Sequence, residues 1–466
     1  MIPTTQLKLS NLVPLILAPL LALLVWNSPL ELTPSAHKCA GIIVWVAGWW
    51  LCTLIPLHVT GLIGLIIAHF LGLSSWNELL IPYADPIIFL FMGGFFIAQA
   101  VELHQLDQWL VQRTLSVKYI RGNSQRLFIA LTLITTLLSA FLSNTATAAL
   151  VIPIGMQILR RSAAPQEAFK LVLLLAGAAS IGGCITPVGS PPNMIALGLM
   201  QKITGHRPDF LSWVMHMAPL SLMMLLGLLL VYKKELSLLS TEEGLKSSEP
   251  RKLTNPQLIL LSLIMVTCLF WFLPGLVGTL SAGKTAKFLH TYFTESLVAT
   301  LAGVILMLTP TRAGPLLPWR EAQKIDWATL MLFGSGLSLG QLAFKTGLAA
   351  ALATQLETLS HLSPDVLLMI AIVATLFFTE LASNTATANL VIPILLASSA
   401  FLMEADRTVY AIVAAANMAF ILPVGTPPNA IAFATGEVKL GDMLWRGFFA
   451  NIISALLIIF FSLLFF

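Results

Sequence analysis

The sequence predicts an all-α polytopic membrane protein with about 11 transmembrane helices and two re-entrant helical hairpins, arranged as two inverted-topology repeats. Composition is the first of three observations behind this prediction, since 57% of the 466 residues are hydrophobic and 10% are charged. Soluble proteins carry about 25% charged residues. The chain therefore needs a bilayer as its main solvent. The other two observations are a duplicated pair of motifs and the charges around two long apolar segments.

The apolar segments are long enough for membrane-spanning helices, which need about 20 residues. Spans are predicted at residues 11–28, 39–57, 59–73, 86–102, 168–200, 213–232, 256–273, 293–309, 326–350, 406–436 and 443–466. Two further segments, 126–160 and 364–400, are too long and too interrupted for one simple helix. We interpret each of these two segments as a re-entrant hairpin.

A polar linker at residues 233–255 divides the chain near its middle. The first repeat is predicted at 39–232 and the second at 256–466, after an N-terminal span and loop at 1–38. The linker carries basic residues, which favours a cytoplasmic position.

Two motifs occur once in each half of the chain. FLSNTATAALVIPI at Phe141–Ile154 matches LASNTATANLVIPI at Leu381–Ile394, an offset of 240 residues (381 minus 141). PVGSPPN at Pro187–Asn193 matches PVGTPPN at Pro423–Asn429, an offset of 236 residues (423 minus 187). Paired interrupted segments in two halves of a membrane protein are the best sequence indication of a carrier's binding site.

The charges around the two hairpins indicate opposite orientations, because Lys and Arg mark the cytoplasmic side. Both flanks of the first hairpin are basic, with Arg113, Lys118, Arg121, Arg126, Arg160, Arg161 and Lys170. The flanks of the second are mainly acidic, with Glu357, Asp365, Glu404 and Asp406 beside the single cation Arg407. Five predicted spans, an odd number, separate the hairpins, so the second hairpin enters from the opposite side of the membrane. The N-terminus is then cytoplasmic and the C-terminus lies outside.

Ser143, Asn144 and Thr145 are expected at the tip of the first hairpin, because these residue types favour helix N-caps. A helix that ends at the tip exposes carbonyl oxygens, which suit a cation. A helix that begins there exposes N–H groups, which suit an anion. Ser383–Thr385 repeats this arrangement in the second half.

The Pro-Pro motifs follow the same logic. Gly189 permits unusual backbone angles, Ser190 can cap a helix, and Pro191 suits its first turn. No Lys or Arg occurs in either tip or either Pro-Pro motif. An anion would therefore be held by helix termini, hydroxyls, amides and bound cations. Intramembrane Glu380 is expected to pair or to support the hairpin backbone rather than to bind a cation.

In these motifs the sequence resembles the divalent anion/sodium symporter family, the sodium-coupled carriers of dicarboxylate, citrate and sulfate. The resemblance covers nearly the whole chain, and the stretches Tyr83–Ala98 and Thr379–Thr385 also carry it. It implies a homodimer in which a scaffold domain and a mobile transport domain work as an elevator. It also implies that Na⁺ is the coupling ion, with two or more ions bound.

The resemblance assigns site residues through the matched motifs. The first sodium site would use Ser139, Ser143, Asn144 and the Gly189 carbonyl. The second would use Thr379, the Ala382 carbonyl, Asn384 and the backbone near Gly425. The substrate would contact Asn144, Thr145, Ser190, Asn384, Thr385, Thr426 and Pro427. Ser190 departs from the family pattern, where Thr is commoner, which leaves the identity of the anion open.

The function expected from the sequence is sodium-coupled uptake of a small divalent anion, in first place a C4-dicarboxylate such as succinate, malate or fumarate. The alternatives are sodium-independent dicarboxylate exchange and symport of sulfate or a tricarboxylate. A membrane metalloprotease is excluded because the chain has no HExxH motif. Nothing resembles a channel filter or a nucleic-acid-binding surface. The expected location is the bacterial inner membrane, with lipids as partners. The four cysteines, Cys39, Cys52, Cys184 and Cys268, are expected to be free thiols.

Overall fold

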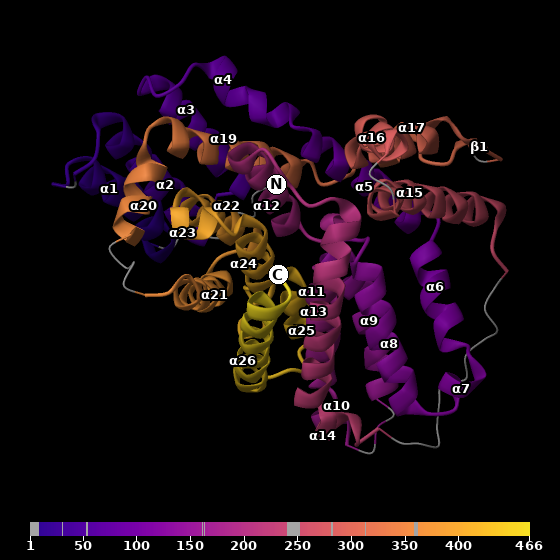
Figure 1. The fold of residues 1–466 in the computed structure, drawn as a ribbon. Helices are drawn as coiled ribbons and strands as arrows, with labels where there is room; N and C mark the ends of the chain where they lie inside the picture. Colours follow the sequence, from indigo (N-terminus) through magenta and orange to yellow (C-terminus); the bar gives the residue numbers. More distant parts are fainter. Residues whose placement is uncertain are drawn as a thin grey trace.

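The computed structural model describes residues 9–29, 31–52, 55–160, 162, 164–239, 252–280, 283–312, 314–357 and 362–466. Arg161 and residues 240–251 of the predicted linker lie outside this described part. Helices form most of it (Figure 1). A short antiparallel pair joins β1 (Pro310–Thr311) to β2 (Gly314–Pro315), with Pro310 opposite Pro315. All four cysteines are free, as expected.

The first half of the chain forms the helices as far as the linker. They are α1 (Leu9–Trp26), α2 (Pro34–Cys52), α3 (Leu57–Phe70), α4 (Trp76–Leu80), η1 (Ile81–Ala84), α5 (Pro86–Leu103), α6 (Leu106–Leu115), α7 (Lys118–Arg121), α8 (Ser124–Ser139), α9 (Asn144–Leu159), α10 (Pro165–Ala168), α11 (Leu171–Gly182), η2 (Pro187–Gly189), α12 (Pro191–Thr204), α13 (Phe210–Val231) and α14 (Lys233–Leu236). The domain boundary predicted at residue 39 falls inside α2.

The second half forms the remaining helices. They are α15 (Asn255–Leu280), α16 (Lys284–Tyr292), α17 (Glu295–Leu308), α18 (Trp319–Ala322), α19 (Trp327–Lys345), α20 (Leu348–Glu357), α21 (Pro364–Leu381), α22 (Asn384–Ala397), α23 (Ser399–Leu402), α24 (Ala405–Asn417), α25 (Pro427–Ala434) and α26 (Leu440–Leu464).

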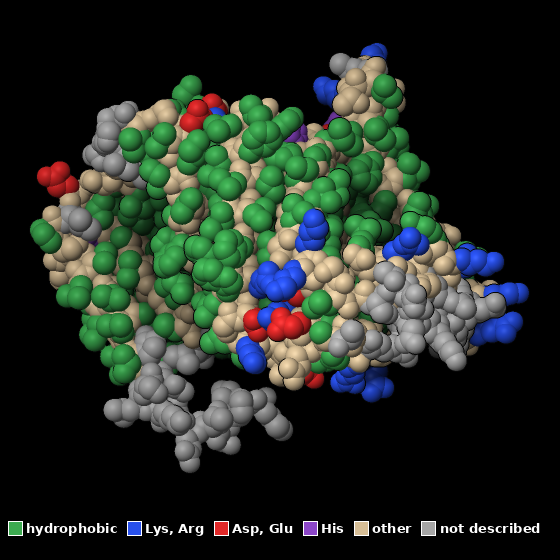
Figure 2. All heavy atoms as spheres, turned by 90° about the horizontal axis from the view of Figure 1, so that it is seen from below, with side chains coloured by type: hydrophobic (Ala, Val, Ile, Leu, Met, Phe, Trp, Pro, Cys, Tyr) green, Lys and Arg blue, Asp and Glu red, His purple; other side chains and the backbone are tan. Residues whose placement is uncertain are grey.

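Six of the described helices are long and apolar enough to cross a membrane, namely α5, α13, α15, α19, α21 and α26. Six shorter apolar helical stretches accompany them, namely Leu15–Trp26 of α1 together with α3, α8, α9, α17 and α22. Figure 2 shows hydrophobic side chains over much of one face of the molecule, with Lys and Arg gathered in its lower middle and along its right edge. The surface is therefore that of an integral, multi-pass membrane protein.

The long interrupted segments each form two helices. The first predicted hairpin is α8 followed by α9, which lie side by side (Figure 1), and the second is α21 followed by α22. Predicted span 168–200 is broken into α11 and α12, and span 406–436 into α24 and α25. These four breaks build the site.

The two halves interlock around the breaks. Helix α11 packs against α8 and α9 of its own half, and α24 packs against α21 and α22. The second arm of each broken span then crosses to the other half. Helix α12 packs against α22 and α24, while α25 packs against α9 and α11. This exchange brings both tips and both Pro-Pro loops together.

Candidate functional site

Both tips begin their second helix with a serine N-cap. Ser143 accepts a hydrogen bond from the Ala146 amide at 3.4 Å, and Ser383 accepts one from Ala386 at 3.2 Å. These contacts satisfy N–H groups that lack partners at a helix start. The expectation that Ser-Asn-Thr marks a helix beginning is confirmed at both tips.

Three oxygen atoms meet behind the first tip. The Ser139 hydroxyl oxygen lies 2.6 Å from Asn144 Oδ1 and 2.6 Å from the Ala179 carbonyl oxygen. Ser139 is fully buried. A hydroxyl has only one hydrogen to donate, so it can satisfy only one of these two oxygens at a time.

The second tip repeats this cluster. The Thr379 hydroxyl oxygen lies 2.8 Å from Asn384 Oδ1 and 2.6 Å from the Ala416 carbonyl oxygen. Thr379 is also fully buried. The matched contacts give each tip a buried, oxygen-rich cluster with too few hydrogens.

The asparagine of each Pro-Pro motif braces the unwound segment before it. Asn193 Nδ2 donates to the carbonyl oxygens of Gly183 and Thr186, both at 2.8 Å. Asn429 Nδ2 donates to the equivalent carbonyls of Ala419 and Leu422, at 2.8 and 3.1 Å. The same pair of hydrogen bonds therefore stabilises the unwound segment of each broken span.

The two loops differ at the residue before the first proline. Thr426 accepts a hydrogen bond from the Asn429 amide at 3.3 Å and caps α25. Ser190 makes no such cap, which corrects the sequence-based expectation. Its hydroxyl instead donates to Asn417 Oδ1 at 2.6 Å. Both helices begin with proline, as expected.

Asn417 is a site residue that the sequence analysis missed. It is fully buried at the end of α24, and its Nδ2 donates to Asn193 Oδ1 and to the Val413 carbonyl, each at 3.0 Å. Its own carbonyl oxygen accepts from Asn384 Nδ2 at 3.4 Å. A single asparagine after an apolar run, six residues before a Pro-Val-Gly motif, was the available signal.

Glu380 supports the unwound segment that follows α24. Its carboxylate accepts hydrogen bonds from the backbone amides of Phe420, Ile421 and Leu422, at distances from 2.7 to 3.1 Å. Asn451 Nδ2 donates to the same carboxylate at 2.7 Å. Glu380 is expected from the sequence to pair or to support the hairpin backbone; it supports backbone, but that of the neighbouring broken span.

A pocket of about 780 Å³ joins these parts. All seven residues expected to contact substrate line it, namely Asn144, Thr145, Ser190, Asn384, Thr385, Thr426 and Pro427. Of the expected cation ligands, Ser143, Asn144, Gly189, Asn384 and Gly425 line it as well. Ser139, Thr379 and Ala382 are buried outside this lining, and the first two hydrogen-bond to the tip asparagines.

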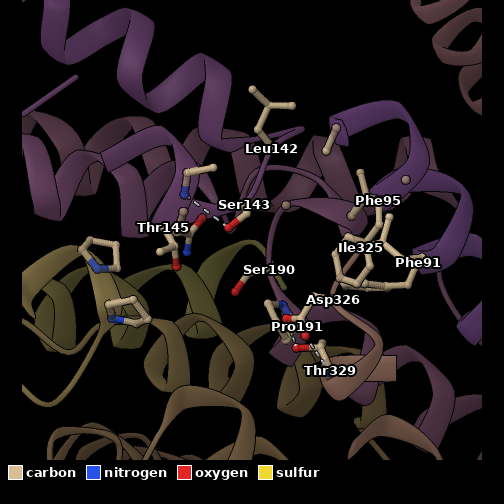
Figure 3. Close-up of a pocket in the computed structure, with 18 of the residues that line it drawn as sticks. Phe91, Phe95, Leu142, Ser143, Thr145, Ser190, Pro191, Ile325, Asp326 and Thr329 are labelled. Carbon is tan, nitrogen blue, oxygen red and sulfur yellow. Dashed lines mark hydrogen bonds between the residues drawn. The ribbon is translucent and has the colours of Figure 1, made fainter. Parts of the chain in front are cut away.

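The opposite wall comes from α5 and from the connection between α18 and α19, which the sequence analysis did not assign to the site. Figure 3 shows Phe91, Phe95 and Ile325 across the pocket from Ser143 and Ser190. The signal for the first two was their place in the Tyr83–Ala98 stretch.

The pocket has little positive charge of its own. Lys324 is the one basic residue in the described lining, and its ammonium is hydrogen-bonded to the Glu321 carboxylate at 2.7 and 2.9 Å. Glu102, Asp107 and Asp326 add acidic groups to the lining.

A multi-pass helical protein whose broken helices meet at a pocket lined by hydroxyl and amide groups belongs to the class of membrane transporters. The chain is a member of the citrate transporter (CitMHS) family, which it matches over residues 42–413. The resemblance found in the motifs is thereby confirmed, and so is the choice of a transporter over an enzyme.

The chain is similar to transporters over almost its whole length. It is 31% identical to the sodium-dependent dicarboxylate transporter SdcS of Staphylococcus saprophyticus, over 97% of this chain and 91% of that one. It is 33% identical to an uncharacterized transporter of Haemophilus influenzae, over 92% of each chain. Its fold resembles the crystal structure of the Alcanivorax borkumensis YdaH transporter, with a TM-score of 0.53, 13% identity and coverage of 98% and 97% of the two chains.

Proposed function

We propose that the protein couples inward movement of sodium to uptake of a small divalent anion, with C4-dicarboxylates as its first substrates. The observation that carries this proposal is the pair of matched oxygen clusters at Ser139–Asn144 and Thr379–Asn384, which border one pocket. The SdcS relatives are named sodium-dependent dicarboxylate transporters, which supports it.

A cation resolves the shortage of hydrogens in each cluster. Hard cations bind hydroxyl, amide and carbonyl oxygens, and these are the groups that meet at each tip. A sodium ion there would also use Ser143 and the Gly189 carbonyl at the first tip, and the Ala382 carbonyl and Gly425 backbone at the second. At the second tip the Asn384 nitrogen faces the Asn417 carbonyl, so its oxygen faces the Thr379 hydroxyl. If the Asn144 nitrogen faced the Ser139 hydroxyl instead, the first cluster would be satisfied without a cation. Sodium titration separates these two arrangements.

The same ions explain how an anion could be held. Helices α9, α12, α22 and α25 begin at the pocket and direct partial positive charge toward it. Each such terminus is worth roughly half a charge, so the four together about balance a dianion but leave the three acidic residues uncompensated. Two sodium ions would supply the missing charge, so substrate binding should depend on sodium.

The pocket also fits a transport cycle. Glu102, Asp107 and Lys324 line it and belong to segments that the predicted topology places at the cytoplasmic face. The structure would then represent an inward-facing state in the inner membrane, with a cytoplasmic N-terminus and an external C-terminus. Ion pairs such as Lys170–Asp442 and Arg207–Glu295, which each join segments assigned to one side, support this topology. We extend the proposal to an elevator-type homodimer.

Citrate is a second candidate substrate, because the family that the chain matches is described as citrate transporters. Sulfate symport and sodium-independent dicarboxylate exchange complete the alternatives. They share the same pocket, so transport measurements have to distinguish them.

Uptake of labelled succinate into proteoliposomes tests the proposal, with an inward sodium gradient in one set and potassium in its place in the other. We expect uptake only with sodium, and competition by malate and fumarate. Uptake that requires preloaded dicarboxylate and ignores sodium would make the protein an exchanger. If succinate is not taken up but citrate or sulfate is taken up with sodium, that anion is the substrate and the sodium coupling still holds.

A further inference from the structure

The hydrogen positions in the buried network around Asn417 can be assigned one by one. Asn193 lies against the Gly183 and Thr186 carbonyls, and a carbonyl can only accept. The nitrogen of Asn193 must therefore face those carbonyls. Its oxygen is left to face Asn417 at 3.0 Å.

The next link in the chain follows from this one. Asn417 has to present its nitrogen to Asn193 Oδ1, and the same nitrogen donates to the Val413 carbonyl. Asn417 Oδ1 then faces the Ser190 hydroxyl at 2.6 Å. Ser190 must donate its one hydrogen to Asn417, since an amide oxygen can only accept.

Ser190 therefore meets the pocket with lone pairs only. It lines the pocket, yet its hydrogen points away from it. Thr426 in the other loop differs, because its oxygen accepts from the Asn429 amide and its hydrogen remains available to an anion. Toward the pocket, Ser190 is thus a hydrogen-bond acceptor and Thr426 is a hydrogen-bond donor.

The difference comes from a single position in the repeat. Thr379 donates to the carbonyl of Ala416, and Ser139 donates to that of Ala179, so Asn417 and Ser180 follow equivalent residues. The Ser180 hydroxyl is buried and has no hydrogen-bond partner in the described part of the chain. The first half therefore has a serine, without an amide group, at the position that Asn417 holds in the second half.

We infer that Asn417 makes Ser190 an acceptor for a substrate hydroxyl, so that the site prefers hydroxylated di- or tricarboxylates over their deoxy analogues. A carboxylate oxygen beside Ser190 would face lone pairs, whereas a hydroxyl there can donate. Asn417 is a positioning residue in this scheme, since it acts through Ser190. The inference rests on the proposed function and refines its substrate class.

Two pairs of compounds that differ by one hydroxyl provide the test, L-malate with succinate and citrate with tricarballylate. In proteoliposomes with an inward sodium gradient we expect a KM lower by about fivefold for the hydroxylated member of the transported pair, the value of one ordinary hydrogen bond. Equal KM values, or a lower KM for the deoxy compound, would overturn the inference with the unmutated protein alone.

Variants then test the route through Asn417. Asn417→Ala frees the Ser190 hydrogen, and Ser190→Ala removes the acceptor, so each should bring the KM ratio close to one. In a double-mutant cycle the second change should add nothing to the ratio. Ser180→Ala is the matched control, and its ratio should equal that of the unmutated protein. A merely structural role of Asn417 would lower uptake of both compounds and leave the ratio unchanged.

The outcomes separate this inference from the proposed function. An unmutated protein without sodium-driven uptake of any of these carboxylates contradicts the proposed function, and the inference fails with it. Sodium-driven uptake with a KM ratio of one contradicts the inference and leaves the proposed function standing. A KM ratio above one that Asn417→Ala does not alter contradicts the role of Asn417.

Discussion

Gly183 lies directly against the Asn144 side chain at the first tip. A methyl group on Gly183 would be 2.5 Å from Asn144 Oδ1, closer than side-chain carbons approach. The glycine is required here because an unwound segment of one broken span contacts the tip of a hairpin. The proposed cation and anion sites both depend on the position of Asn144.

The close approach predicts that Gly183→Ala displaces Asn144 and lowers sodium-driven uptake at least tenfold. Membrane insertion should be unchanged, because the displaced group is one side chain. Gly122→Ala is the matched control, since a methyl group there meets no atom within 4 Å. The measurement is the uptake rate per membrane-inserted protein. Equal rates in the two variants would contradict this prediction.

Loss of the Thr379 hydroxyl should weaken sodium binding. We expect Thr379→Val to raise the half-saturating sodium concentration by about tenfold or more, because a hydrogen-bonding group that faces a charge contributes about 1.5–3 kcal/mol. Thr375→Val is the control, since Thr375 lies one turn earlier and bonds only to the Ala371 carbonyl of its own helix. A sodium curve that shifts equally in both variants would remove Thr379 from the cation site.

Removal of the Glu380 carboxylate should destabilise the unwound segment after α24. Glu380→Ala leaves the three backbone amides of residues 420–422 without their acceptor. Each unsatisfied buried group costs about 1–3 kcal/mol, so we expect a clear fall in Tm and loss of uptake. The Tm of Glu380→Gln, which keeps one acceptor oxygen, should lie between that of Glu380→Ala and that of the unmutated protein. A Glu380→Ala protein with unchanged Tm would show that the carboxylate does not brace this backbone.

The ion pair between Glu78 and Lys345 predicts a specific pH dependence. The Lys345 ammonium, followed by hydrogen bonds from Ser74 and Ser75, lowers the pKa of Glu78 from 4.5 to about 2. The folded protein therefore takes up this proton at lower pH than the unfolded chain. The stabilisation is complete above pH 4.5 and is lost as the pH falls toward 2.

The corresponding experiment compares the Tm of the unmutated protein with that of Glu78→Gln. The difference should be small at pH 7, because the pair is exposed to solvent, and smaller still at pH 3. Lys345→Gln should behave like Glu78→Gln. A difference that grows on acidification would have the wrong sign for this pair.

Local chemistry made several features predictable from the sequence. Ser143 and Ser383 cap helices because a serine before a helical run accepts a hydrogen bond from a free backbone amide. Pro191 and Pro427 start helices because the first turn requires no amide hydrogen from proline. Repetition of these signals in both halves then indicated four breaks at one site. The seven expected substrate residues line one pocket for this reason.

The sequence by itself determined the membrane class, the breaks and the family, because each depends on composition or on short-range backbone preferences. Only the tertiary structure decided which side chains complete the site. Ser190 could be a cap by its sequence, but Asn417, which is 227 residues away along the chain, takes its hydrogen instead. Phe91 of α5 and Ile325, in the connection between α18 and α19, reach the pocket through tertiary packing. A hydrogen bond between distant residues leaves no periodic or local trace in a sequence, so the donor and acceptor roles of the two loops became visible only in the fold.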